Sequence, residues 1–191
     1  MARVTLVKRP DDYPYLINSE TGRELARLFE YLLPGVADPR IDESHDGIAI
    51  AAHNPGLATQ LAQLSRFMAL DLPWCERQDL RELAIQVVNH ELKCTYSFRT
   101  RVAVAAAAGV SPDAQDALSQ WQTSSLFNQE QRLVIEYTEA VIRGEVSDAL
   151  FCRVAKAYTE KGAVEFTTVV AFWSFWAMLL NATRPDTGDT A

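Results

Sequence analysis

The chain has 191 residues, of which 48% are hydrophobic and 23% charged, so it can bury one core and is neither disordered nor fibrous. Its formal charge of −7 argues against binding to the phosphate backbone of nucleic acid. The first residues carry no signal-peptide pattern, and the longest apolar run, 169–180, is too short to span a bilayer. We therefore expect a cytoplasmic protein with no nucleic-acid partner and no membrane partner.

Apolar residues recur at helical spacing along most of the chain, between segments punctuated by Pro and Gly. In chain order, the expected helices cover 22–33, 54–70, 76–92, 94–108, 111–121, 128–143 and 147–161, with a last helix after Gly162 to about residue 182. No segment of alternating β-branched residues argues for a sheet. The prediction is an all-α protein with one domain, divided into an N-terminal arm with the first helix (1–40), a helical domain (41–183) and a flexible tail (184–191).

Several of these boundaries rest on capping residues. Asn54 before Pro55, Ser111 before Pro112, Asn128 and Ser147 are side chains that accept hydrogen bonds from the first free amides of a helix. Gly109 and Gly144 are placed where helices end.

Polar and reactive side chains gather between residues 82 and 101. On one continuous helix, five of them would share an arc of roughly 80°, with Glu82 about 40° beyond its edge. These five are Gln86, His90, Cys94, Ser97 and Arg101. The neighbouring runs 83–88 and 103–108 are apolar enough to predict burial on nearly all sides. Charged groups in such surroundings must be paired or line a cavity, although a solvated face stays an alternative.

The same segment resembles the active-site region of the alkylhydroperoxidase-D-like / carboxymuconolactone decarboxylase superfamily. In that superfamily a glutamate lies twelve residues before the first cysteine of a Cys-x-x-Cys pair, and a histidine follows the second cysteine by four. Glu82 and Cys94 match the glutamate and the first cysteine. Ser97 stands at the second cysteine and Arg101 at the histidine, so this chain resembles a divergent member. A break between the two helices is usual there, and would fall near Lys93.

These replacements have chemical consequences. Ser97 cannot form the disulfide that the resemblance would imply for peroxide reduction. Arg101 stays protonated at any relevant pH and cannot act as the general base that the family's histidine provides. His90, four residues before Cys94, could move a proton instead, or could be merely packed or solvated. A peroxidase cycle based on an internal disulfide is therefore not expected.

Arg101 has two interpretations that the sequence leaves open. It could form an internal ion pair with Glu82, or it could hold a substrate carboxylate through two parallel hydrogen bonds. Both could apply in turn, with Glu82 as the partner when no ligand is bound.

Cys94 and Tyr96 also have two interpretations each. Cys94 could be a small buried apolar residue, or a reactive thiol at a helix N-terminus near Arg101. Tyr96 could donate a hydrogen bond to a substrate oxygen or simply pack. Cys75 and Cys152 have no partners at metal-ligand or disulfide spacing and are expected to be structural. His53 is expected to lie at a helix entrance and His45 in a polar loop.

The resemblance implies a helical bundle, a homo-oligomer and a cofactor-free enzyme without a metal. The expected activity is of the lyase or isomerase type on a small cyclic or unsaturated carboxylate. Glu82, His90, Cys94 and Ser97 would form the catalytic group, and Arg101 and Tyr96 would bind the substrate. One alternative is a thiol-dependent peroxidase in which Cys94 works with an external thiol. Another is a non-catalytic protein that binds a ligand.

Overall fold

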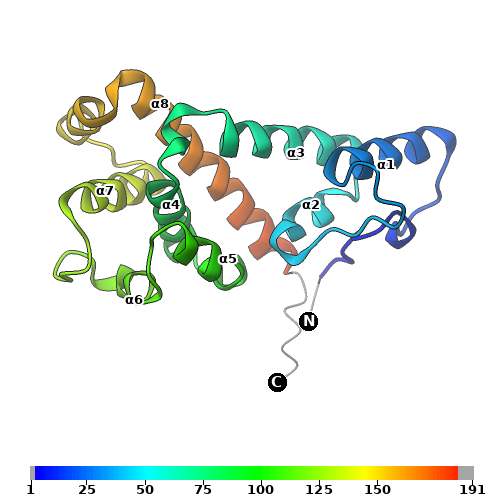
Figure 1. Cartoon of the computed structure of the whole chain (residues 1–191), viewed down its shortest axis with the longest axis horizontal. Coiled ribbons are helices and arrows are strands. Elements are labelled where there is room, and N and C mark those ends of the chain that lie inside the picture. Colours follow the sequence, from blue (N-terminus) through cyan, green and yellow to red (C-terminus); the bar gives the residue numbers. More distant parts are fainter. Residues whose placement is uncertain (1–2, 185–191) are drawn as a thin grey trace. The chain divides into compact units, whose positions relative to one another are not determined.

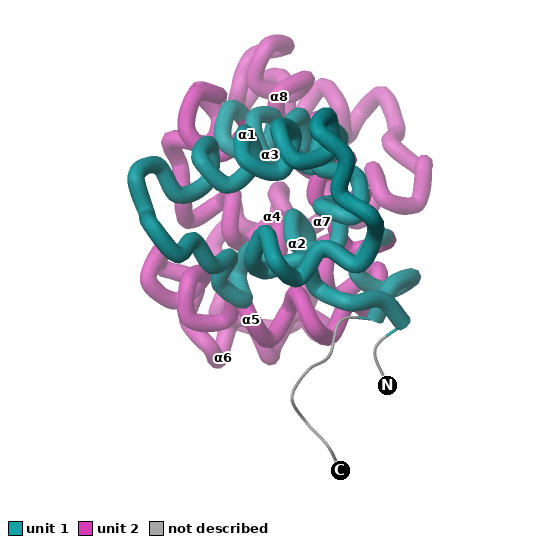
Figure 2. Tube along the Cα trace, turned by 90° about the vertical axis from the view of Figure 1, so that its right-hand side faces the viewer, with its two compact units in different colours: residues 1–67, 179–191 teal, residues 68–178 magenta. Residues whose placement is uncertain are grey.

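The computed structural model describes residues 3–184, and these residues form helices with no β-strand (Figure 1). The all-α prediction is therefore confirmed for this part of the chain. The expected tail at 184–191 lies, apart from Arg184, outside the described residues. Contacts group the chain into two compact units (Figure 2). Unit 2 is Met68–Met178, and unit 1 holds the residues before and after it.

Unit 1 contains the N-terminal helices. They are η1 (Pro10–Asp12), α1 (Ser19–Leu32), η2 (Glu43–His45), α2 (Asp46–Ala51) and α3 (Pro55–Leu70), of which α3 continues into unit 2. The short α2 was not predicted, because it has no side-chain cap and only six residues on which a period can be seen. Its buried Asp46 forms an ion pair with Lys8 (2.8 Å).

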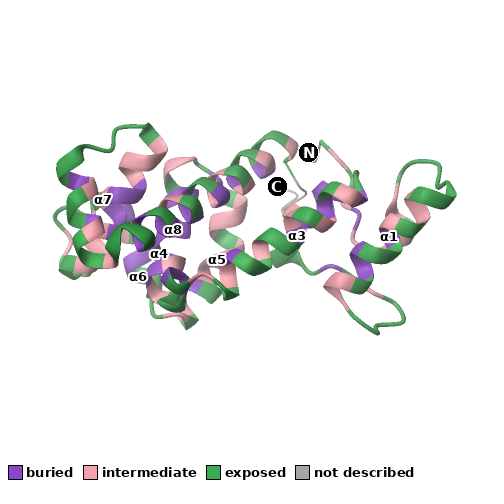
Figure 3. Ribbon diagram, turned by 90° about the horizontal axis from the view of Figure 1, so that it is seen from above, coloured by how far each residue is buried: buried purple, intermediate pink, exposed green. Residues whose placement is uncertain are grey.

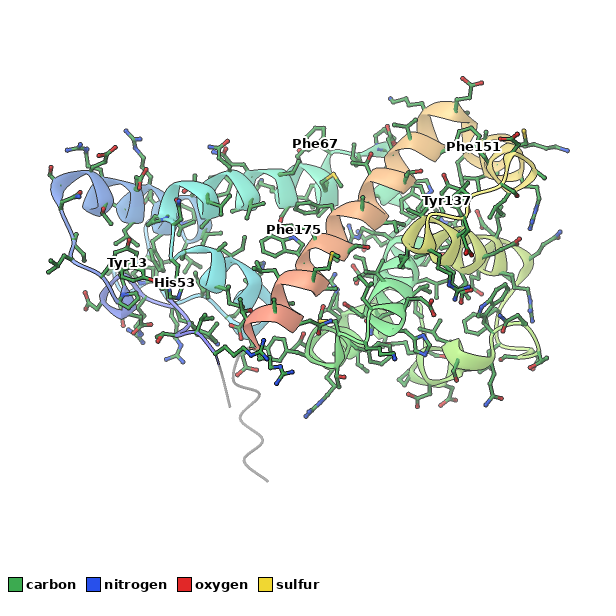
Figure 4. The ribbon with its side chains drawn as sticks, turned by 180° about the vertical axis from the view of Figure 1, so that it is seen from behind. Tyr13, His53, Phe67, Tyr137, Phe151 and Phe175 are labelled. Atoms are coloured by element: carbon green, nitrogen blue, oxygen red, sulfur yellow. The ribbon has the colours of Figure 1, made fainter. Side chains whose placement is uncertain are left out.

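His53 has a structural place in unit 1. Its Nε2 lies 2.8 Å from the backbone oxygen of Thr5, and its Nδ1 lies 3.0 Å from the hydroxyl of Tyr15. Tyr13 packs edge-on against Tyr15, and Figure 4 shows its side chain near His53. These contacts hold the N-terminal segment beside the entrance to α3.

Unit 2 is built around one helix, α4. Its elements are η3 (Pro73–Glu76), α4 (Gln78–Glu91), α5 (Thr95–Ala107), α6 (Pro112–Asp116), η4 (Ala117–Gln120), α7 (Gln129–Arg143) and most of α8 (Asp148–Thr183). α4 packs against α5 and α7, and all residues from Glu82 to Asn89 are buried (Figure 3). Tyr137 of α7 is fully buried and bonds to Thr167 of α8 through their hydroxyls (2.7 Å; Figure 4).

The predicted caps are present. The side chains of Asn54, Ser111, Asn128 and Ser147 accept hydrogen bonds from the backbone amides of Leu57, Ala114, Gln131 and Leu150. Gly109 and Gly144 have φ of 105° and 70°, a region that favours glycine. These helix ends follow from local hydrogen bonds, which explains why the sequence located them.

The predicted pair of helices around Gly162 is one element, α8, with its break at Thr159 instead. Thr159 has φ of 67° and ψ of 168°, which residues other than glycine rarely adopt. Its Oγ1 accepts a hydrogen bond from the backbone N–H of Gly162 (3.3 Å), as an N-cap side chain does. A Cβ at Gly162 would lie only 2.8 Å from the Cβ of Tyr158, so the glycine is needed for close packing after the break.

Within residues 3–184, α8 is long and apolar enough to cross a membrane by length and composition alone. The apolar run 169–180, which Ser174 interrupts, is only part of this helix, which begins at Asp148. However, 44% of its most apolar stretch is buried inside the protein, and a core helix of a soluble protein meets the same criterion. The expected absence of a membrane partner remains a prediction.

The turn between α4 and α5 falls where the sequence suggested. Leu92 ends α4, Lys93 has a left-handed backbone (φ 54°), and Cys94 is the N-cap residue of α5. The stripe expected on one continuous helix is therefore divided between two helices.

The predicted burial of 103–108 is wrong: Ala105 is the buried residue of α5, whereas Ala103, Val104 and Ala107 are exposed. Small alanine side chains were mistaken for core, but they also suit an exposed helix face.

Gln86 joins three elements of unit 2 and should be costly to replace. Its amide nitrogen donates to the Phe98 carbonyl (3.2 Å) and to Gln115 Oε1 (2.6 Å), and its oxygen accepts from Asn89 (3.0 Å). We expect Gln86→Leu to lower the free energy of unfolding by about 2–4 kcal/mol, because it leaves buried polar groups unpaired. Urea unfolding would measure this, with the exposed Gln63→Leu as the control. A loss below about 0.5 kcal/mol for Gln86→Leu would contradict the expectation.

Candidate functional site

The centre of the candidate site is the carboxylate of Glu82, which lies between two arginines. Arg101 of α5 donates to both oxygens, from Nη2 to Oε2 at 2.7 Å and to Oε1 at 2.9 Å, and from Nε to Oε2 at 3.2 Å. Arg81 donates to Oε1 from Nη2 (3.1 Å) and Nε (3.2 Å). The Glu82 side chain is 1% exposed, so the two guanidinium groups neutralise a charge that water does not reach.

The pair of helices that carries this site is an antiparallel hairpin with a regular polar register. Glu82 on α4 meets Arg101 on α5, and Gln86, one turn further on, meets the Phe98 carbonyl. In the last turn the Asn89 carbonyl accepts from the backbone N–H of Cys94 (2.8 Å). The fixed spacing between Glu82 and Arg101 in the sequence is therefore the spacing of partners across a hairpin that turns at Lys93.

Three residues that support the site were not predicted. They are Arg81, Asn89 and Gln115. Gln115 is 2% exposed and donates to the carbonyls of Val102 (3.1 Å) and Val110 (2.8 Å) as well as pairing with Gln86. A signal was available for Asn89, since an amide three residues after Gln86 in a buried helix must find a partner. For Gln115 no such signal existed, because its partners come from distant residues.

Cys94 is completely buried at the start of α5. Burial raises the pKa of its thiol above the ordinary value, and the backbone N–H of Ser97 offsets this only in part. Arg101 follows Cys94 by seven positions, which corresponds to about 10 Å along a helix. The pKa of the Cys94 thiol is therefore raised, whereas a reactive thiol near Arg101 would have a lowered pKa. This geometry favours the interpretation of Cys94 as a buried apolar residue in the ligand-free protein.

The other predicted site residues lie at different places. Ser97 and Tyr96 are half-buried in the first turn of α5, next to Cys94. His90 is on the exposed side of α4, and its Nδ1 lies 3.5 Å from Glu91, which also pairs with Arg143 (2.7 Å). The structure thus brings Glu82 and Arg101 together, keeps Cys94, Tyr96 and Ser97 on one turn, and places His90 apart from the Glu82 cluster.

The remaining cysteines differ in burial. Cys75 is buried near Arg81, Glu82 and Glu165, and burial raises the pKa of its thiol to about 11. Cys152 is exposed. Over residues 3–184 no three His, Cys, Asp or Glu side chains are grouped so that they could hold a metal ion.

Comparison with known proteins gives similarity in structure only. No protein-family model and no curated protein matches the sequence. The debrominase Bmp8 in its apo form is 18% identical, with a TM-score of 0.64 over 94% of this chain and 91% of the other. A cysteine-to-alanine variant of Bmp8 in complex with 2,3,4-tribromopyrrole is 17% identical, with a TM-score of 0.67 over 97% and 93%.

The chain has the fold of Bmp8. This confirms the expected alkylhydroperoxidase-D-like helical fold. At such low identity the similarity extends to the fold and not to the site residues.

The burial of two thiols leads to a prediction about reactivity. At pH 8 we expect a disulfide reagent such as DTNB to modify one thiol per chain rapidly, that of the exposed Cys152. Cys75 and Cys94 should react only on unfolding, because a raised pKa leaves little of the nucleophilic thiolate. Cys152→Ser should abolish the rapid phase. A rapid phase that survives in Cys152→Ser and disappears in Cys94→Ser would show a reactive Cys94.

Proposed function

We propose that this protein is a divergent member of the alkylhydroperoxidase-D-like superfamily and a cofactor-free enzyme of the lyase or isomerase type. Its substrate is a small cyclic or unsaturated carboxylate. Arg101 binds the substrate carboxylate or stabilises developing negative charge, and Glu82 moves the proton. The protein would work in the cytoplasm.

The observation that carries this proposal is the excess of positive charge around Glu82. Two guanidinium groups face one carboxylate, so the cluster keeps a net positive charge. The Arg101 side chain is 21% exposed, and its bonds to Glu82 use Nε and Nη2. Within the described part of the chain its Nη1 has no hydrogen-bond partner. A partly accessible guanidinium with unused donors is suited to an incoming carboxylate.

The size and shape of the substrate are inferred from the fold. The Bmp8 variant of the same fold holds 2,3,4-tribromopyrrole, a small unsaturated ring. This supports a compact unsaturated ligand for the present chain. Tyr96 and Ser97, half-buried on the same helix as Arg101, are the proposed further contacts for it.

A thiol-dependent activity is the second candidate, and one observation favours it. The backbone N–H of Ser97 acts on the Cys94 thiol at the N-terminus of α5 and lowers its pKa against the effect of burial. A conformational change that exposed Cys94 would leave a thiolate stabilised by this amide, and an external thiol would have to resolve the oxidised product, since Ser97 cannot. The thiol measurement described above separates this candidate from the first.

Arg101→Lys should bind a small carboxylate poorly. An ammonium cannot reproduce the two parallel bonds of a guanidinium, and loss of such a charge-assisted pair should cost about 2–5 kcal/mol of binding. Benzoate is a suitable probe in an NMR titration, with neutral benzamide as the control ligand. Arg99→Lys, on an exposed neighbour in α5, is the matched control variant and should bind as the parent does.

Two results would contradict the carboxylate site. One is equal binding of benzoate to the parent and to Arg101→Lys, and the other is equal binding of benzoate and benzamide. Turnover is then tested separately on unsaturated carboxylates, and binding without turnover would favour the non-catalytic alternative.

We also propose that the protein is a homo-oligomer. Between Val164 and Met178, the exposed residues of α8 recur at intervals of four and three, as in the contact seam of paired helices, and are apolar except for Thr168. They are Val164, Thr168, Ala171, Phe175 and Met178. Phe175 and Met178 are 39% and 63% exposed, and Figure 4 shows Phe175 extending from the helix.

Sedimentation at micromolar concentration should therefore show a dimer or larger assembly. The double variant Phe175→Glu, Met178→Glu should sediment as a monomer, because it places charges in an apolar contact. Lys156→Glu, exposed on the same helix, should leave the assembly intact. A monomeric parent protein would refute the proposal.

A further inference from the structure

We propose that Arg81 is a positioning residue that holds Glu82 in place when a ligand carboxylate takes Arg101 away from it. The inference rests on the proposed function, because it assumes that an anion binds at Arg101. It assigns to the second arginine of the cluster a task that differs from that of the first.

The two arginines hold Glu82 in different ways. Arg101 contacts both carboxylate oxygens, whereas Arg81 contacts only Oε1. Oε2 accepts from Nη2 and Nε of Arg101, at 2.7 and 3.2 Å. If Arg101 turned to a ligand, Oε1 would keep its two bonds to Arg81 and Oε2 would lose all of its own.

Arg81 is also the more firmly fixed of the two. Its Nη1 donates to the backbone carbonyl of Ala69 at 2.7 Å, so a single guanidinium joins that carbonyl to the Glu82 carboxylate. Its side chain is 14% exposed, compared with 21% for Arg101. Arg81 precedes Glu82 on the same helix, whereas Arg101 reaches Glu82 from α5. An entering anion would therefore exchange with Glu82 at Arg101 and not at Arg81.

This exchange would prepare the carboxylate for proton transfer. The freed Oε2 would accept the proton from the bound ligand, and the electron pair of the broken bond would stay on the ligand beside the positive charge of Arg101. Arg81 would meanwhile keep Glu82 from following Arg101 or swinging out of place. Arg81 thus acts through Glu82 and does not touch the ligand.

A thermodynamic coupling follows. Glu82 pairs with Arg81 and Arg101 within the described residues, so without Arg81 it depends on Arg101 for its positive partner and competes more strongly with a ligand for that guanidinium. Removing Arg81 should therefore weaken anion binding, but only while residue 82 carries a carboxylate. A general loss of positive charge, in contrast, would weaken binding with or without that carboxylate.

The test is a double-mutant cycle on the full chain, with benzoate as the probe and NMR titration as the measurement. We expect Arg81→Gln to raise the dissociation constant about tenfold. Glu82→Gln should lower it, because Arg101 becomes free. Adding Arg81→Gln to Glu82→Gln should then change it less than twofold. Urea unfolding of each variant checks that it is folded, and if Arg81→Gln does not fold, Arg81→Lys takes its place, since one ammonium cannot span both partners.

The outcomes separate the inference from the proposed function. If benzoate binding depends on Arg101 but Arg81→Gln has the same effect with and without Glu82→Gln, the positioning role is overturned and the carboxylate site stands. The same holds if Arg81→Gln has no effect in either background. If benzoate binds neither the parent nor Glu82→Gln, or binds without regard to Arg101, the proposed function fails and the inference fails with it.

Discussion

The packing of unit 2 depends on a buried carboxylate that must be neutralised where α4 and α5 meet. Removing one partner of such a buried ion pair typically costs about 3–5 kcal/mol, so Glu82 restricts how the two helices can pair. The register that places Arg101 on Glu82 also places the Phe98 carbonyl on Gln86 and the Cys94 amide on Asn89. A slip of one residue would separate Arg101 from Glu82 and the Phe98 carbonyl from Gln86. The ion pair and the hydrogen bonds thus fix the register between α4 and α5, while burial of the apolar residues of α4 stabilises their packing.

Two functional groups with different chemistry lie at different positions along α5. Its N-terminal turn carries Cys94, whose thiol has a pKa raised by burial, and two turns later Arg101 carries a permanent charge. The peroxidase chemistry implied by the resemblance uses a thiol with a histidine as base, and Arg101 stands at the position of that histidine. The function that we propose instead needs an anion site at Arg101 beside a carboxylate that exchanges partners. This physical difference is the reason to favour a small carboxylate over a peroxide.

Much of the fold could be predicted because it is encoded locally. The starts at Asn54, Asn128 and Ser111 depend on bonds within one helical turn, and the ends at Gly109 and Gly144 on the backbone of a single residue. Where tertiary packing determines the local structure, the predictions from the sequence were wrong. The break in α8 lies at Thr159, whose φ of 67° has no signal in the sequence, and the exposed Ala103, Val104 and Ala107 of α5 are apolar residues that composition alone assigns to a core.

For the site, the sequence determined which residues could pair but not which do. The distance from Glu82 to Arg101 along the chain, with a turn near Lys93, was enough to suggest an ion pair or a carboxylate clamp. Only the tertiary structure decided that Arg81 shares the carboxylate, that Gln115 closes the amide network from α6, and that His90 faces solvent one residue after the buried Asn89. The reason is that helical periodicity fixes the relative directions of side chains on one helix. Which residue each side chain contacts depends on how separate helices pack against one another.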